Sequence, residues 1–343
     1  MTQLPQRPLP ELTTKHSRYL EVSADTDFGI GVKLGEQLGH AVRCRLHENR
    51  ALHAMSWDRH LQQARQYLGH AEAAFPHLVN ELQGYAAGAG VSFEELWLLN
   101  LRDDVFGKEA RRSASLVSSG GQLSGHTEDC ASSEGSPFVL RRNLRGKSKL
   151  ELHYAGTWGG NAWSVNRASW VQMVNPLRHR DQQHGVPRDL VARLLSDAED
   201  PMTAKRQLRG MRHSAGQSFT WHRLASGSAS WNLELSAQHT DYRVVRTPFA
   251  HTNHYLGSLR SGDFGLSLES KRRLSQARRH CLPQMSASQM QDVLSIGNGC
   301  GTGKLFNSST VARIVTALGV AWVWLRSERH RGWVPYDLDF TYA

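Results

Sequence analysis

The sequence predicts an α+β protein with a mostly antiparallel sheet, because its periodicity changes in blocks along the chain. Helical patterns dominate between about residues 56 and 100, and short strand-like runs bounded by Gly, Ser and Asn follow from Ser113. A second set of helical patterns and then further strands complete the order. Blocks of helices and strands that alternate in this way are typical of α+β architectures.

The first helical stretch carries recognisable start and stop signals. Its apolar residues recur every three or four positions: Leu61, Ala64, Tyr67 and Leu68. Pro76 is expected to begin a second helix. Three glycines are expected to interrupt that helical pattern: Gly84, Gly88 and Gly90. Ser92, with Glu95 three residues later, predicts the start of another helix through a capping box.

The rest of the chain is expected to supply the strands and two further helices. Strands are predicted at residues 114–117, 138–141, 163–165, 170–174, 218–224, 231–235 and 242–245, and helices at 188–196 and 268–280. Neither an internal repeat nor a long linker is apparent. We therefore expect one domain over residues 1–343.

Composition narrows the classes of function. The chain has 343 residues, 39% of them hydrophobic, so it can bury a substantial core. Lys and Arg number 41 against 31 Asp and Glu, and the net charge of +10 favours acidic partners or substrates. The basic residues form short separate clusters, which are typical of solvated faces. No nucleic-acid partner is therefore expected, and electrostatic binding to nucleic acid stays a minor alternative.

Cysteine usage and hydropathy bear on the compartment. The four cysteines are spaced without any Cys-x-x-Cys pair: Cys44, Cys130, Cys281 and Cys300. This pattern favours neither a zinc ribbon nor a dense disulfide framework and fits a reducing cytoplasm. The N-terminus lacks a charged segment followed by an apolar run, and residues 317–325 are too few to span a bilayer. A soluble, cytoplasmic protein with no membrane partner is expected.

Two segments combine polar residues in a way that suits acyl-group chemistry. Ser113 opens a strand-like run, and residues 125–129 (Gly-His-Thr-Glu-Asp) follow after a Gly turn. A hairpin would place this hydroxyl beside a carboxylate. In residues 251–255 (His-Thr-Asn-His-Tyr), the Asn253 amide lies between two imidazoles, and such a donor can stabilise an oxyanion. A serine in a strand is usually a packing residue, so only their co-occurrence points to an enzyme.

Together these motifs resemble the isopenicillin N acyltransferase family of N-terminal-nucleophile hydrolases, which includes the β-alanyl-dopamine hydrolases. Residues 76–91 are similar to the family's helical pattern, in which Pro leads to Glu-Leu-x-Gly and Ala-x-Gly-Ala-Gly. Residues 125–129 resemble its Gly-His-Asn-Glu-Asp strand. Residues 251–254 match its His-Thr-Asn-His segment, the most specific of these motifs. The likeness spans roughly residues 28–320.

The resemblance implies a four-layer αββα sandwich and an activity on acyl groups. It implies hydrolysis of an amide bond or acyl transfer, with a small amide, peptide or acyl thioester as donor and water or an amine as acceptor. Small-molecule biosynthesis is the setting that it suggests. The chemistry needs no cofactor, and the sequence carries no cofactor motif.

In the family, a precursor cuts itself just before a Cys, and the freed α-amine then serves as base for the thiol. The matching position here is Ser113, so cleavage would give associated chains 1–112, mainly helical, and 113–343. A free α-amine with a pKa near ~8 can accept a proton from a hydroxyl. Threading the motif places Asp129 at the carboxylate that supports the new terminus and Asn253 at the amide that polarises the acyl oxygen. The neighbouring polar residues are expected to bind substrate: His126, Glu128, His251 and His254.

Two alternatives stay open at this point. Ser115 could take the nucleophile position, although Ser113-Ala114-Ser115 fits the family's Cys-Thr-Ser pattern with Ser113 first. The family usually has Gly before the nucleophile, where this chain has Arg112. An uncut chain would be a catalytically silent member that binds a small amide or acts as a scaffold. Lys304 and Arg313 are the candidates for the family's late basic residue.

Three other features are interpreted as structural. Residues 299–304 resemble a phosphate-binding loop but lack its first Gly and its Ser or Thr, so a glycine-rich turn is expected. His251 and His254 should project from opposite faces of a strand, so no shared metal ion is expected. Cys130 should point away from Asp129 for the same reason.

Overall fold

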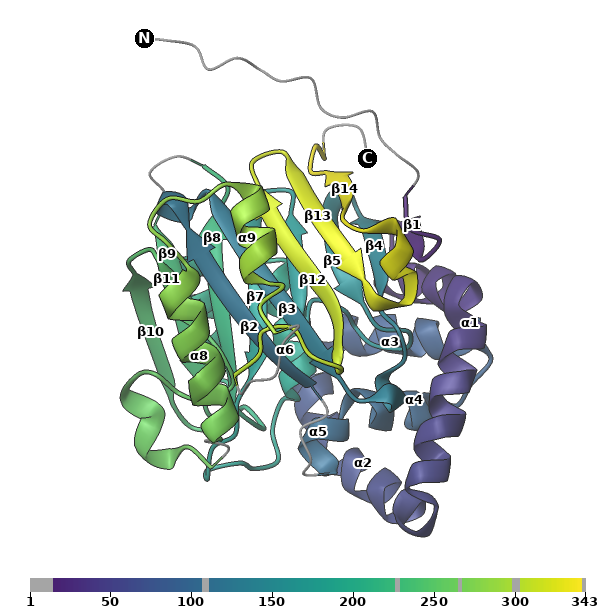
Figure 1. Cartoon of the computed structure of the whole chain (residues 1–343). Helices are drawn as coiled ribbons and strands as arrows, with labels where there is room; N and C mark the ends of the chain where they lie inside the picture. Colours follow the sequence, from purple (N-terminus) through teal and green to yellow (C-terminus); the bar gives the residue numbers. More distant parts are fainter. Residues whose placement is uncertain (1–14, 107–110, 226–228, 265–266, 298–302, 341–343) are drawn as a thin grey trace.

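Two β-sheets stacked face to face form the centre of the protein. The computed structural model describes residues 15–106, 111–225, 229–264, 267–297 and 303–340 (Figure 1). The larger sheet has eight described strands in the order β1-β4-β5-β6-β7-β8-β9-β10, and the smaller has six in the order β11-β2-β3-β12-β13-β14. Only the pairing of β1 with β4 is parallel among the described strands.

The strands are short and are joined mostly by turns. Those of the larger sheet are β1 (Tyr19–Ala24), β4 (Phe138–Leu144), β5 (Lys147–His153), β6 (Trp163–Asn166), β7 (Trp170–Pro176), β8 (Gln217–Arg223), β9 (Ser230–Leu235) and β10 (Thr240–Val245). Those of the smaller sheet are β2 (Arg111–Ser118), β3 (Leu123–Cys130), β11 (Phe249–His251), β12 (Thr310–Ala317), β13 (Val320–Leu325) and β14 (Val334–Asp337).

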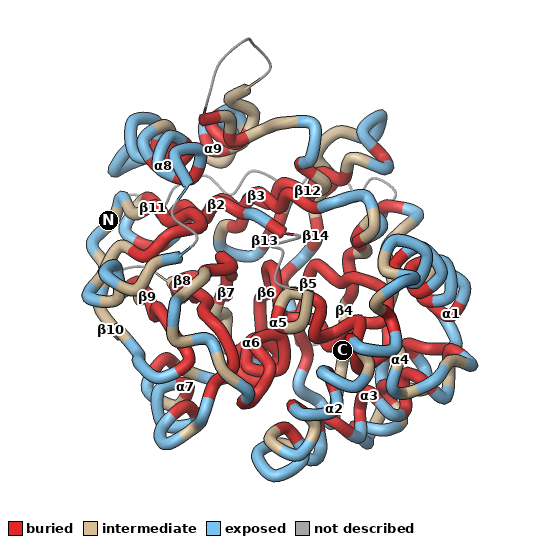
Figure 2. The backbone as a smooth tube through the Cα atoms, turned by 90° about the horizontal axis from the view of Figure 1, so that it is seen from below, coloured by how far each residue is buried: buried red, intermediate tan, exposed pale blue. Residues whose placement is uncertain are grey.

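Helices cover the outer face of each sheet, as Figure 2 shows. Against the larger sheet lie α1 (Asp27–Leu52), α2 (Trp57–Ala74), α3 (Pro76–Ala89), α4 (Phe93–Asn100), α5 (Arg102–Val105), α6 (Arg188–Ser196) and α7 (Pro201–Leu208). Against the smaller sheet lie α8 (Leu268–His280) and α9 (Ala287–Val293). None of the described helices is long and apolar enough to cross a membrane.

Three hydrophobic cores separate the four layers. The core between the helices and the larger sheet includes Leu34, Leu82, Trp97, Leu140 and Phe219. The core between the two sheets includes Leu150, Trp163, Met173, Ile314 and Val323. The core under α8 and α9 includes Leu116, Leu274, Ala277, Met290 and Val315. This stacking confirms the predicted αββα sandwich.

Several local predictions are confirmed. Pro76 occupies the first turn of α3, and the Ser92 hydroxyl accepts the Glu95 N–H at 3.3 Å at the start of α4. The Glu95 side chain pairs with Arg50 instead of completing the capping box. Helices α6 and α8 begin and end at the predicted residues. Helix α1 and the hairpin of β12 and β13 were not predicted.

The expected interruption at Gly84 and Gly88 of the helix that begins at Pro76 is wrong, because both glycines lie inside α3. A Cβ added at Gly84 would lie 2.1 Å from the carbonyl oxygen of Phe28 in α1. A Cβ added at Gly88 would lie 2.1 Å from that of Val32. These glycines therefore allow two helix backbones to approach closely. Only Gly90 ends the helix, in the left-handed conformation with φ 65°.

Gly84→Ala is expected to lower the free energy of unfolding by roughly 1–3 kcal/mol, because the added methyl group must separate α1 from α3. Gly69→Ala in α2 is the matched control, since nothing lies within 4 Å of its added Cβ. The greater helix propensity of Ala should make that variant more stable by roughly 0.5–1 kcal/mol. Urea denaturation measures both changes. Equal effects at the two positions would contradict the close packing.

Candidate active site

The hairpin of β2 and β3 positions the predicted nucleophile. Antiparallel pairing sets Ser113 opposite Glu128 and Ser115 opposite His126. Side chains alternate along a strand, and Val117 belongs to the core between the sheets. Ser113 and Ser115 therefore point inward, toward the larger sheet.

The Ser113 hydroxyl is fully buried and held in one direction. Its Oγ donates to the carbonyl oxygen of Val174 at 2.9 Å and accepts from Nδ2 of Asn175 at 2.8 Å. Both partners belong to β7 in the opposite sheet. Asn175 was missed by sequence reasoning. The available signal was a second side-chain amide, after Gln172, near the end of a mainly apolar strand.

Asn253 lies beside Ser113, as the motif predicted. Its Oδ1 accepts the backbone N–H of Ser113 at 3.1 Å, and its Nδ2 donates to the carbonyl oxygen of Pro176 at 3.1 Å. Its own backbone N–H donates to Ser270 Oγ in α8 at 2.9 Å. The side-chain amide thus contacts the chain at the proposed cleavage site and the end of β7.

Arg273 is the basic residue of this site, which sequence reasoning also missed. Its guanidinium donates to the carbonyl oxygen of Ser113 at 3.3 Å and to Oδ1 of Asn253. Arg313, one of the two predicted candidates, packs instead over the rings of Phe306, Trp324 and Trp333.

A signal for Arg273 was present in the pattern of α8. Although the residue belongs to the basic cluster at 271–273, it shares the buried stripe of the helix with Ser270, Leu274 and Ala277. A charged residue on the apolar stripe of an amphipathic helix needs a partner inside the protein. That requirement distinguishes Arg273 from its exposed neighbours.

Asp129 lies on the outer face of β3 and reaches Ser113 only through Arg273. Its Oδ1 accepts from the Thr310 hydroxyl at 2.6 Å, and its Oδ2 accepts from Asn307 Nδ2 at 2.9 Å. Arg273 Nη1 lies 3.7 Å from Oδ2. In the register of the hairpin Asp129 stands opposite Arg112. The carboxylate therefore fixes the guanidinium that contacts Ser113.

Glu128 and His126 lie on the inner face and contact Ser115. Ser115 Oγ lies 3.2 Å from His126 Nδ1, and His126 Nε2 lies 3.2 Å from Glu128 Oε2. All three side chains are buried. Burial raises the pKa of the Glu128 carboxyl against the opposing effect of the His126 hydrogen bond. Neither residue has a described hydrogen bond to Ser113.

The two histidines of the Asn253 motif have separate partners. His251 Nε2 lies 2.8 Å from Glu234 Oε1, and His254 Nδ1 lies 2.8 Å from Ser270 Oγ. Burial lowers the pKa of His254 to about 4, so the ring is neutral near pH 7. β11 ends at His251, so the predicted strand is shorter than expected. The described residues contain no group of three His, Cys, Asp or Glu side chains arranged for a metal ion.

Cys130 is a buried thiol on the inner face, turned away from Asp129 as predicted. Its Sγ lies 2.8 Å from the hydroxyl of Tyr154 and 3.9 Å from Glu128 Oε1. Burial raises the pKa of this thiol well above its usual range. A thiolate is the reactive form, so Cys130 is not an activated nucleophile. The predicted glycine-rich turn at 299–304 lies largely outside the described residues.

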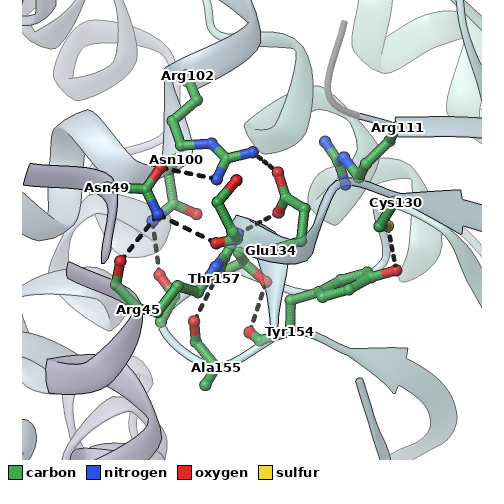
Figure 3. Close-up of polar contacts among 12 residues, drawn as sticks. Arg45, Asn49, Asn100, Arg102, Arg111, Cys130, Glu134, Tyr154, Ala155 and Thr157 are labelled. Carbon is green, nitrogen blue, oxygen red and sulfur yellow. Dashed lines mark hydrogen bonds and ion pairs between the residues drawn. The ribbon is translucent and has the colours of Figure 1, made fainter. Parts of the chain in front are cut away.

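A buried cluster of charged residues anchors the chain just before Ser113. Figure 3 shows Arg45 and Arg102 converging on Glu134, with Arg111 beside them. Arg111 also pairs with Asp189, since its Nη2 donates to both carboxylate oxygens, at 2.8 and 2.7 Å. Burial lowers the pKa of Arg102 to about 9, so the guanidinium stays charged at neutral pH. Arg111 thus holds β2 against α5 and α6, while Arg45 and Arg102 hold α1 and α5 against the segment that follows β3.

The stack of two sheets between helical layers, together with a family model that matches more than half of the chain, identifies an acyltransferase or amide hydrolase of the N-terminal-nucleophile type. The chain belongs to the acyl-coenzyme A:6-aminopenicillanic acid acyl-transferase family, whose model matches residues 118–301, more than half of its length. The matched span includes Asp129, Asn253 and Arg273 and begins after Ser113.

Among solved structures, the chain matches penicillin V acylase from Agrobacterium tumefaciens. The two chains are 12% identical, with a TM-score of 0.42, and the match covers 63% of this chain and 83% of the other. The sequence has no match among curated proteins.

Arg273→Leu is expected to lower the free energy of unfolding by roughly 3 kcal/mol, because it leaves the buried Asp129 carboxylate without its charge partner. Arg272→Leu is the matched control on the same helix, where the side chain is exposed. That change should alter stability by less than about 0.5 kcal/mol. Guanidinium denaturation of both variants measures the two changes in the free energy of unfolding. Similar small losses would show that Arg273 does not support the site.

Proposed function

We propose that this protein hydrolyses an amide bond or transfers an acyl group through an ester formed on Ser113. The observation that carries the proposal is the hydrogen bond from the Ser113 backbone nitrogen to Asn253 Oδ1 at 3.1 Å. Cleavage of the Arg112–Ser113 bond would turn this nitrogen into an α-amine while Asn253 still holds it. An amine held next to its own hydroxyl can act as the base.

The reaction then follows from the groups that cleavage would leave at the site. The α-amine takes the hydroxyl proton as Oγ attacks the acyl carbon of the donor. The bond from that carbon to the leaving nitrogen or sulfur breaks, and the leaving group receives the proton. Water or an amine next attacks the ester, gives its proton to the α-amine, and the Ser113 hydroxyl is restored.

The surrounding residues have distinct roles in this proposal. Asn175 Nδ2 aims the hydroxyl, and the Asn253 amide stabilises the oxyanion once its Nδ2 turns from Pro176 to the acyl oxygen. Arg273 fixes Asn253 and is itself fixed by Asp129. Asp129 thus supports the new terminus through the guanidinium rather than by direct contact.

Cleavage would leave chains 1–112 and 113–343 as an associated pair. Arg111 would stay paired with Asp189, and β1 would stay in the larger sheet beside β4. The packing of α1 and α3 against that sheet would also be unaffected. The proposed donor is a small amide, peptide or acyl thioester, and the proposed acceptor is water or an amine. The proposed setting is small-molecule biosynthesis in the cytoplasm.

One observation favours a second candidate, a catalytically silent protein that binds a small amide or acts as a scaffold. In the uncut chain the Ser113 nitrogen is an amide without basicity, and β2 continues through Arg112 and Arg111 with regular pairing to β3. The described partners of the hydroxyl are a carbonyl and a side-chain amide. Neither can accept its proton.

Mass spectrometry of purified protein is expected to find a chain that begins at Ser113 and an activated acyl probe attached to that residue. Ser113→Ala should lower turnover at least about a thousandfold, because the residue that forms the covalent intermediate is lost. Ser113→Cys is the matched variant that keeps a nucleophile and should remain active. A single intact chain that the probe never labels would refute the enzyme mechanism and favour the silent candidate.

A further inference from the structure

A row of buried polar side chains runs from Ser113 into the space between the sheets. We call Asn175, Ser115, His126 and Glu128 the polar row. Asn175 Nδ2 lies 2.8 Å from Ser113 Oγ, and Asn175 Oδ1 accepts from Ser115 Oγ at 2.9 Å. His126 Nδ1 lies 3.2 Å from Ser115 Oγ, and Glu128 Oε2 lies 3.2 Å from His126 Nε2. Every member is at least nine-tenths buried, so water does not satisfy these groups.

The direction of each hydrogen bond in the row follows from its first member. The carbonyl oxygen of Val174 can only accept a hydrogen bond, so the Ser113 hydroxyl is the donor in this contact. Ser113 Oγ must then accept from Asn175, which turns the amide N–H toward Ser113 and Oδ1 toward Ser115. Ser115 must in turn donate to Oδ1, and its oxygen is left to accept from His126 Nδ1.

The same reasoning determines which atoms of His126 and Glu128 carry hydrogen. His126 must carry hydrogen on Nδ1, so a neutral ring would present Nε2 as an acceptor to Glu128. Glu128 must then be protonated, or the ring must be an imidazolium beside a carboxylate. In both states one proton is held between Nε2 and Oε2. The burial that raises the pKa of Glu128 agrees with this inventory.

We propose that Ser115, His126 and Glu128 are positioning residues, which lock the Asn175 amide with its N–H toward Ser113 and so aim the Ser113 hydroxyl for attack. The proposal rests on the proposed role of Ser113 as nucleophile. Without a donor at Ser115, the amide can rotate by half a turn and present its oxygen to Ser113 Oγ. Misdirection of a reacting group by this amount commonly slows reactions by roughly a hundredfold.

Ser115→Ala tests the row, with Ser124→Ala as its matched control. Ser124 is also fully buried, belongs to β3, and its hydroxyl has no hydrogen-bond partner among the described residues. Ser115→Ala is expected to lower kcat roughly ten- to a hundredfold with little change in KM, since aim and not binding is lost. Ser115→Thr, which keeps the donor, should recover most of that loss. Ser124→Ala should leave kcat near that of the parent.

A second pair of variants tests the proton inventory and does not depend on Ser115. Glu128→Gln presents an N–H to His126 Nε2 and keeps hydrogen on Nδ1, so it should recover most of the kcat that Glu128→Leu loses. Equal losses in the two would overturn the proposal. Thermal unfolding of each variant separates a misfolded chain from an active-site effect.

The outcomes distinguish this inference from the proposed function. If the acyl probe labels Ser113 in the parent and Ser115→Ala keeps the parental kcat, the positioning role is refuted and the nucleophile stands. If the probe labels Ser115 and Ser113→Ala stays active, Ser115 is the nucleophile with His126 as its base, and both proposals fall.

The double variant Ser115→Ala, His126→Phe should lose no more kcat than either single variant, because the polar row acts as a unit.

Discussion

The site depends on the side-chain amide of Asn253, which joins three of the four layers at Ser113. It accepts from the Ser113 backbone in the smaller sheet and from Arg273 in α8, and it donates to Pro176 at the end of β7 in the larger sheet. These atoms are buried, and a buried polar group left unpaired costs about 1–3 kcal/mol. The two sheets and the outer helix are therefore held in one relative position at Ser113.

The alternation of side chains along β2 and β3 determines which partners each residue of the site contacts. Because Ser113 and Ser115 share the inner face, the Ser113 hydroxyl meets the backbone of Val174 and the side chain of Asn175. Asp129, one residue beyond Glu128, projects to the other face and acts on α8 instead. Consecutive carboxylates thus serve opposite sides of one strand, one fixing the guanidinium and the other ending the polar row.

Local signals in the sequence predicted elements well and their partners poorly. Pro76, the Ser92 cap and the periodicity of residues 188–196 and 268–280 act within one segment, so each could be interpreted alone. Gly84 was interpreted as a helix interruption, because the close packing that requires this glycine involves α1, which is distant in the sequence. Arg273 and Asn175 were missed for a related reason. Periodicity shows that a side chain is buried, but only the stacking of layers shows what it meets.

The anchors on either side of the Arg112–Ser113 bond differ in kind. On the N-terminal side, Arg111 is fixed by the buried carboxylates of Asp189 and Asp103, whereas Arg112 itself is exposed and pairs with Glu269 at the surface. On the other side, the Ser113 nitrogen and carbonyl are held by Asn253 and Arg273. A cut between these anchors would release only Arg112 to solvent. The new amine would stay in place, because the Asn253 and Arg273 contacts that position it lie on the Ser113 side of the broken bond.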